Sequence, residues 1–276
     1  MSVGGGLEYF RSGEGPAVLL LHGAMGGYDQ SVRLGLAAIG ETGFDGIAVS
    51  RPGYLGTPLS AGRKPEEQAD LCARLLDTLG IEQAAVVAVS GGGQCALTFA
   101  LRHAERCRAV VMISACSAPL TAKIPLRFHV LSFLAHFPAI IVRMQKKAAT
   151  DFEKAAQRSI PDPVLRAAML NDPEVGPLFR DHVVGTFDRM RERIGGTQND
   201  IGQSRLPFDY PVEQIAVPVL VVHGTDDEAV PFAQAEALAS RVKCGELLAI
   251  EGGQHVSLFT HRQLIQARVR AFLGLL

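Results

Sequence analysis

The chain has 276 residues, of which 47% are hydrophobic and 20% are charged, and its formal net charge is −1. This length and apolar content predict one large domain with a substantial core, alone or with an insertion. Because the charges are balanced and dispersed, nothing indicates a nucleic acid or an anionic membrane surface as a partner.

The beginning of the chain and its cysteines both favour a cytoplasmic location. The first residues form neither the basic region nor the apolar region of a secretory signal. The five cysteines are scattered without Cys-x-x-Cys spacing, which argues against a zinc site or a disulfide framework. No feature of the sequence indicates an oligomeric state.

Predicted strands and helices alternate through the first part of the chain. An edge strand is expected at 7–11, and short apolar runs at 17–21 and 46–50 are typical of strands buried on both faces. Helices are expected at 31–39 and 65–79. This alternation predicts a parallel sheet with right-handed crossovers. Arg51 and Tyr54, in the loop after 46–50, are candidates to line a site, although anchoring a loop is the commoner role of such an arginine.

A serine between small residues joins the next strand, at 84–89, to a helix at 93–102. The segment reads Ala88-Val89-Ser90-Gly91-Gly92. Small residues suit a tight, strained turn that lifts the Ser90 hydroxyl clear of the sheet, in front of a helix N-terminus with free N–H groups. The pattern is that of a nucleophile elbow, with Ala88 in the place of the first glycine.

Two other interpretations of this turn remain open. Residues 91–96 also fit Gly-x-Gly-x-x-Ala, the dinucleotide-binding fingerprint, which expects an acidic residue about 20 positions later. The next predicted strand, at 109–114, is followed by no such acid. The other alternative is an ordinary glycine-rich turn.

The alternation stops between residues 118 and 211, where helical patches, prolines and polar loops predominate. A stretch of this length predicts a folded insertion. We therefore expect a core domain of residues 1–117 and 212–276 and a helical lid at 118–211. Residues 124–144 are strongly apolar, but prolines and charged residues interrupt them and exclude a membrane span. Residues 189–193 are interpreted as a solvated helix face.

Two polar residues follow the last predicted strands. Asp227 comes after a strand at 217–222, and His255 comes after a strand at 246–250. Helices are expected at 232–241 and 263–273. Ligands of open α/β sheets bind at the carboxyl ends of the strands, where both side chains are expected to lie.

The order Ser90, Asp227, His255 is the chain order of the α/β-hydrolases, and the chain resembles this family over nearly its full length. The motifs that carry the resemblance are Leu21-His22-Gly23, Val89-Ser90-Gly91-Gly92, Asp227-Glu228-Ala229-Val230-Pro231 and Gly253-Gln254-His255. The Asp-x-x-Val-Pro pattern selects Asp227 over Asp226. Some relatives carry the acid after the strand equivalent to 109–114, where this chain has none.

The resemblance implies a mostly parallel, doubly wound α/β sheet and a Ser-His-Asp triad. Ser90 is then the nucleophile, His255 the general base, and Asp227 the residue that orients the imidazole. No metal or organic cofactor is implied.

The resemblance also implies an oxyanion hole and a substrate pocket. The backbone N–H groups of Gly91 and Ala24 are the expected donors, and Met25 is the less favoured alternative to Ala24. Residues that are expected to line the pocket are Met25, Phe128, Phe133 and Val230.

The predicted activity is hydrolysis of a small-to-medium, partly apolar ester through an acyl-enzyme, with a small molecule as the partner. A lactonase, a thioesterase, a carbon–carbon bond hydrolase and a cofactor-free lyase remain alternatives, because fold and triad do not determine the substrate. A ligand-binding receptor on the same fold is the non-enzymatic alternative.

Overall fold

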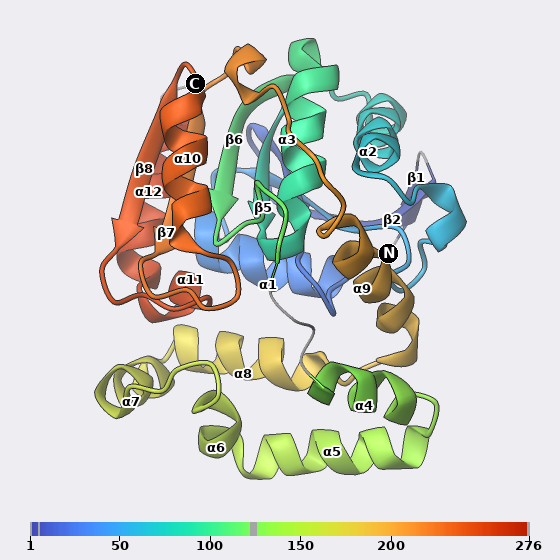
Figure 1. The fold of residues 1–276 in the computed structure, drawn as a ribbon, viewed down its shortest axis with the longest axis vertical. Helices are drawn as coiled ribbons and strands as arrows, with labels where there is room; N and C mark the ends of the chain where they lie inside the picture. The colour runs from blue at the N-terminus through green and yellow to red at the C-terminus, as the bar shows by residue number, and fades with distance from the viewer. Residues whose placement is uncertain (1, 5, 122–125, 275–276) are drawn as a thin grey trace.

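The computed structural model describes residues 2–4, 6–121 and 126–274, so the beginning of the apolar stretch 124–144 lies outside the described residues. Figure 1 shows a twisted sheet with helices on both faces and a further group of helices at one end. The strands are β1 Ser2–Gly4, β2 Leu7–Ser12, β3 Ala17–Leu21, β4 Asp45–Ser50, β5 Ala84–Val89, β6 Cys107–Ile113, β7 Val219–Gly224 and β8 Gly245–Ile250. The helices are α1 Tyr28–Ile39, α2 Pro65–Leu79, α3 Gly93–Arg102, α4 Leu126–Leu134, α5 Pro138–Thr150, α6 Phe152–Ala156, α7 Pro163–Asn171, α8 Val175–Gly185, α9 Arg191–Gln203, α10 Phe232–Arg241, α11 Ser257–Thr260 and α12 Arg262–Gly274.

The sheet is mostly parallel, as predicted. Its strand order is β1-β2-β4-β3-β5-β6-β7-β8, and every pair from β4 to β8 in this order is parallel. Among the described strands, the antiparallel pairs are β1–β2 and β2–β4, at one edge of the sheet. The central strands are short runs of Val, Ile, Leu and Ala buried on both faces, as expected of a parallel sheet covered by helices.

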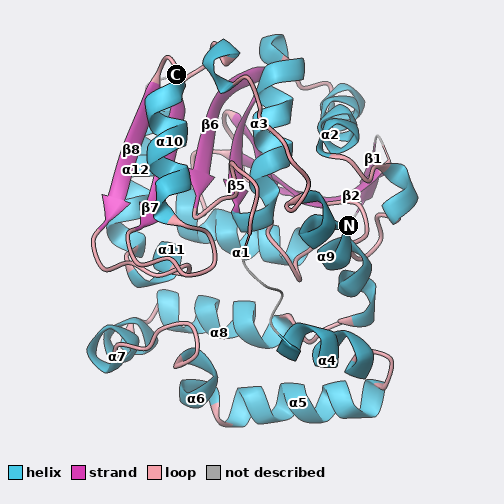
Figure 2. Ribbon diagram, viewed as in Figure 1, coloured by secondary structure: helices cyan, strands magenta, loops and turns pink. Residues whose placement is uncertain are grey.

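Helices cover the two faces of the sheet in separate layers (Figure 2). One apolar core cluster joins the sheet to α2, α3 and α10, and the other joins it to α1, α11 and α12. The bounds of α2, α3 and α10 match the sequence prediction. At α2 the reason is local, since Pro65 occupies the first turn and Gly80 ends the helix in a left-handed conformation.

Helices α4 to α9 lie between β6 and β7 in the chain, within the predicted insertion. In Figure 1 the arrowheads of β6 and β8 point toward α4–α8, so these helices lie beyond the carboxyl ends of the parallel strands. No strand occurs in the described residues between β6 and β7. In the described part of the chain, no helix is both long and apolar enough to cross a bilayer.

A buried arginine of α9 binds this helix to α1 of the core. The prediction of a solvated face at residues 189–193 is wrong for Arg193, which is 1% exposed. Its guanidinium donates to both carboxylate oxygens of Asp29 in α1, at 3.0 and 2.9 Å. Burial opposes the ionisation of Asp29, but the bonds from Arg193 and the charge of Arg33 outweigh it and lower the pKa to about 2.

Replacing Asp29 by Asn should destabilise the fold at neutral pH by about 3 kcal/mol, because the buried Arg193 loses its anionic partner. The folded-state pKa of Asp29 lies below its ordinary value of 3.8, so its contribution is complete above pH 4 and disappears as the pH falls toward 2. Urea unfolding at pH 7, 4 and 2.5 should therefore show a stability gap between the native protein and the variant that narrows with acid.

The matched control is Asp77→Asn. Asp77 pairs with Arg106, but its side chain is 63% exposed, and exposed pairs contribute about 1 kcal/mol or less. An equal loss of stability in the two variants, or a gap that does not change with pH, would contradict the assignment.

Candidate active site

Ser90 lies at a sharp turn between β5 and α3. Its φ angle is +51°, a left-handed conformation that a serine adopts only when the surroundings hold it there. The carbonyl of Ser90 accepts hydrogen bonds from the N–H groups of Gly93 and Cys116. A methyl group on Gly92 would lie 2.8 Å from the Leu21 carbonyl oxygen, and one on Gly93 only 2.4 Å from that of Cys116. These glycines make room for neighbouring protein backbone, which favours the elbow over the dinucleotide fingerprint.

The structure brings the three predicted catalytic side chains together. Nε2 of His255 lies 3.1 Å from Oγ of Ser90, and Nδ1 of His255 lies 2.8 Å from Oδ2 of Asp227. The three residues come from loops after β5, β7 and β8, which are parallel strands whose carboxyl ends meet at this edge. The His255 side chain is 32% exposed and that of Asp227 is fully buried, so the imidazole lies between solvent and a buried carboxylate.

Asp227 is surrounded by hydrogen-bond donors. Its Oδ1 accepts from the N–H groups of Ala229 and Val230, at 2.8 and 2.9 Å. Nε2 of the fully buried His223 lies 3.3 Å from Oδ2. Burial opposes the ionisation of this carboxyl, but hydrogen bonds from His223 and His255 hold its pKa well below the ordinary value. Asp226, the neighbour, is exposed.

The backbone nitrogen of Ala24 lies near the elbow. A methyl group built on Gly91 would lie 3.7 Å from the nitrogen of Ala24, so the two expected oxyanion donors are close to each other. The alternative donor, the N–H of Met25, instead donates to Oγ1 of Thr197 at 2.9 Å. Gly23 packs directly against the nucleophile, since a methyl group there would lie 2.8 Å from Cβ of Ser90.

Two of the expected pocket residues belong to one apolar cluster next to this site. Met25 and Phe128 pack with buried side chains of the inserted helices; the other members are Leu131, Leu134, Ala135, Ile141, Met144, Phe187, Met190 and Ile194. Phe133 lies apart: it is 65% exposed and contacts Phe137, with the two rings tilted and their centroids 5.3 Å apart. Val230 is 2% exposed and supports Asp227 through its backbone.

Sequence reasoning did not identify Asp200 and His223 as members of the site. Asp200, on α9, accepts hydrogen bonds from Nη1 of Arg51 at 3.0 Å and from the Tyr54 hydroxyl at 2.6 Å. Burial and the charge of Asp200 raise the pKa of Tyr54, so its hydroxyl remains a donor. His223 could have been found, because it lies four residues before Asp227. Asp200 has no such local signal.

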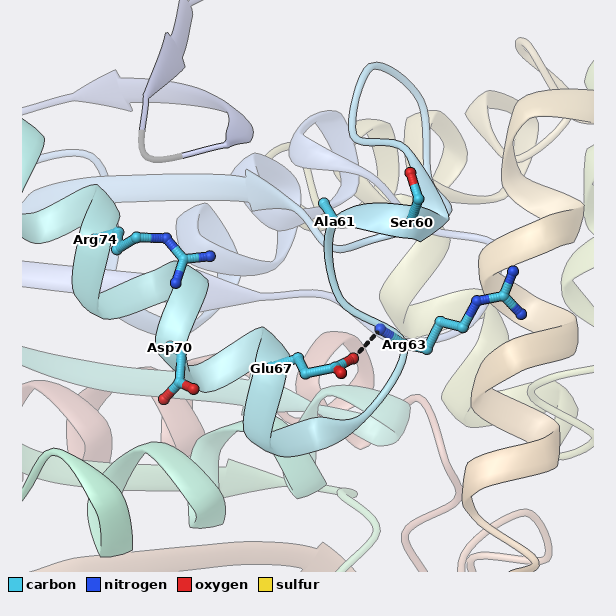
Figure 3. Close-up of a pocket in the computed structure, with 6 residues that line it drawn as sticks. All are labelled: Ser60, Ala61, Arg63, Glu67, Asp70 and Arg74. Atoms are coloured by element: carbon cyan, nitrogen blue, oxygen red, sulfur yellow. Dashed lines mark hydrogen bonds between the residues drawn. The ribbon is translucent and has the colours of Figure 1, made fainter.

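A separate surface pocket of about 270 Å³ lies at the N-terminal end of α2 (Figure 3). It is lined by Ser60, Ala61, Arg63, Glu67, Asp70 and Arg74. Glu67 accepts from the backbone N–H of Arg63 at 2.7 Å and caps the helix, and Asp70 pairs with Arg102 and His103. Both carboxylates of this pocket therefore make contacts that stabilise the fold. None of the loops that carry Ser90, Asp227 or His255 lines the pocket.

Comparisons with known proteins agree with this architecture. The α/β hydrolase fold family matches residues 16–262. Uncharacterized hydrolase YcgS of Bacillus subtilis (strain 168) is 25% identical over 92% of this chain and 89% of its own length. Poly(3-hydroxyalkanoate) depolymerase of Ectopseudomonas oleovorans is 29% identical over 82% of this chain and 74% of its own length. The solved structure of an alpha/beta hydrolase fold protein from Nakamurella multipartita is 28% identical, covers 96% of each chain and has a TM-score of 0.81. The chain therefore belongs to the α/β-hydrolase fold family.

Proposed function

We propose that the protein is a serine hydrolase that cleaves a small-to-medium, partly apolar ester through an acyl-enzyme. One observation carries the proposal: the hydrogen-bonded series in which His255 lies 3.1 Å from the Ser90 hydroxyl and 2.8 Å from the Asp227 carboxylate. A hydroxyl, an imidazole and a buried carboxylate in this order constitute an activated nucleophile.

The mechanism follows from the position of each group. Nε2 of His255 takes the proton of Ser90 as Oγ bonds to the ester carbonyl carbon. The alcohol then leaves with that proton, and the acyl group stays on Ser90. Water attacks the acyl carbon, gives its proton to His255, and the acid is released as Ser90 recovers a proton. Asp227 holds the Nδ1–H tautomer and stabilises the imidazolium that forms in each step.

The negative charge that develops on the carbonyl oxygen is proposed to be held by the N–H groups of Gly91 and Ala24. Each such donor can lower the barrier by about 3 kcal/mol. The proximity of the two groups supports this pairing, and so does the engagement of the Met25 N–H with Thr197.

The apolar cluster around Met25 and Phe128 supports a substrate with an apolar acyl or alcohol part. The name of the depolymerase relative, which denotes cleavage of an ester-linked polymer, points to the same bond. A cytoplasmic location is part of this proposal, and the free state of the described cysteines supports it.

If the cluster binds the acyl chain, kcat/KM on p-nitrophenyl esters should rise about fourfold for each methylene from acetate to hexanoate, since a buried methylene contributes about 0.8 kcal/mol. Phe128→Ala should flatten this dependence, whereas Phe133→Ala, which removes an exposed ring, should leave it unchanged. A panel of thioesters, lactones and vinylogous diketones tests the other reactions. No turnover on any ester would remove the proposed substrate class.

Ser90→Ala should lower kcat by about a thousandfold or more and abolish labelling by a fluorophosphonate, without a change in the circular dichroism spectrum. Ser114→Ala is the matched control, because Ser114 also follows a parallel strand with a positive φ angle, and its buried hydroxyl has no hydrogen-bond partner in the described part of the chain. Comparable turnover in the Ser90 variant, or labelling that persists in it, would refute the nucleophile and leave the receptor hypothesis.

Gly23→Ala should reduce kcat by about a hundredfold, because the added methyl group lies 2.8 Å from Cβ of Ser90 and must displace the nucleophile. Steady-state kinetics and the rate of fluorophosphonate labelling measure this loss. Gly202→Ala is the control, since nothing lies within 4 Å of a methyl group there. Equal activity of the two variants would contradict the prediction that displacement of Ser90 lowers kcat.

A further inference from the structure

One face of α9 contacts the turn that carries the proposed oxyanion donor. Arg193, Thr197 and Asp200 are spaced i, i+4 and i+7, so they share a face of the helix. Arg193 and Thr197 are 1% and 2% exposed, and the side chain of Asp200 is 10% exposed. This buried polar face is directed at residues 22–27, the loop between β3 and α1.

Two of the contacts are direct. Oγ1 of Thr197 accepts the Met25 N–H at 2.9 Å, and it donates to the Arg193 carbonyl at 2.9 Å. Nη1 of Arg193 donates to the Gly26 carbonyl at 2.8 Å. Met25 has a φ angle of +58°, a conformation that the Thr197 bond helps to hold. The backbone after Ala24 is therefore fixed by α9.

The third contact passes through Arg51. Asp200 forms a buried ion pair with Arg51, whose Nε donates to the His22 carbonyl at 2.9 Å while Nη2 lies 3.4 Å from the Gly23 carbonyl. The backbone before Ala24 is thus held by a guanidinium that Asp200 orients, and the Tyr54 hydroxyl donates to the same carboxylate. Contacts on both sides leave the backbone of Ala24 little freedom to move relative to Gly91.

The positive charge of Arg51 offsets the negative charge of Asp200 beside Gly91. A methyl group on Gly91 would lie 3.2 Å from Oδ2 of Asp200 and 3.6 Å from Nη2 of Arg51. An unpaired carboxylate this close to a developing oxyanion would oppose the reaction, since like charges repel strongly where water is excluded. The ion pair neutralises it.

We propose that the Arg193–Thr197–Asp200 face of α9 is a positioning device for the oxyanion hole. The inference rests on the proposed function. These three side chains act through residues 22–27 and Arg51 and are positioning residues, so their loss should lower kcat more than it raises KM. It follows that α9, although it lies in the inserted segment, is part of the catalytic scaffold.

The test compares Thr197→Val with Thr197→Ser. Valine keeps the shape but loses the acceptor of the Met25 N–H, so we expect kcat on p-nitrophenyl butyrate to fall about tenfold with KM within a factor of two. Affinity for a trifluoromethyl ketone, whose adduct with Ser90 carries an oxyanion, should fall by the same factor. Serine retains the oxygen and should keep kcat within a factor of two of the native value.

Thr98→Val is the matched control. Thr98 is 3% exposed and donates within its own helix to the Gln94 carbonyl at 2.8 Å, as Thr197 does to Arg193. Thr98→Val should therefore lose about as much stability as Thr197→Val, because each loses a buried hydroxyl, but its kcat should not change. Asp200→Asn is the second variant and should lower kcat in the same direction, with a Ser90 that still reacts with fluorophosphonate.

The outcomes separate the two proposals. If the unmodified protein neither hydrolyses esters nor reacts at Ser90, the proposed function fails. If it does both, and Thr197→Val and Asp200→Asn keep native kcat and native affinity for the ketone, the positioning role of α9 is overturned. An equal loss of kcat in Thr197→Val and Thr98→Val, or in Thr197→Val and Thr197→Ser, would overturn it as well.

Discussion

The parallel arrangement of β3, β5, β7 and β8 is the constraint on which the site depends. Parallel strands direct all their carboxyl ends to one edge of the sheet, so loops that are far apart in the chain meet there. The His-Gly turn after β3, the elbow after β5 and the loops after β7 and β8 supply the oxyanion loop, Ser90, Asp227 and His255 respectively. The strained backbone of Ser90 is tolerated because the sheet and α3 are buried against each other on both sides of the turn.

Charge at this edge is buried, and each buried charge has a partner. Asp227 is held ionised by hydrogen bonds from two histidines and two backbone N–H groups, although burial alone would favour its neutral form. Arg51 and Asp200 neutralise each other beside Gly91. His22, in contrast, is neutral: burial and the nearby Arg51 keep its pKa well below the ordinary value, consistent with an Nε2 that accepts the Arg51 N–H. The edge is therefore polar and ordered without carrying uncompensated charge.

The elements that the sequence predicts best are those whose causes are local. The strand β5 and the helices α2, α3 and α10 have the predicted bounds, since apolar runs, Pro65 and Gly80 act within a few residues. The contacts of α9 are different in kind. Thr197 binds Met25, which is 172 residues away in the chain, and Asp200 binds Arg51, which is 149 residues away. The mostly polar composition of α9, with two Arg, two Gln and three Gly, is typical of a solvated surface. Similarly, nothing in the pattern of α4 separates Phe128, which packs inward, from Phe133, which faces solvent.

The helices of the inserted segment differ in the kind of contact that they make with the core. Helices α4–α8 contact one another, α1 and α11 mainly through apolar side chains, and the side chain of Met25 in the turn at residues 22–27 joins one of these apolar clusters. Helix α9 instead makes directional hydrogen bonds to that turn and an ion pair with Arg51. Apolar contacts can slide at modest cost, whereas a buried ion pair that separates leaves two unpaired charges. The contacts of α9 with the turn at residues 22–27 and with Arg51 therefore hold this helix to the sheet more firmly than apolar packing alone would.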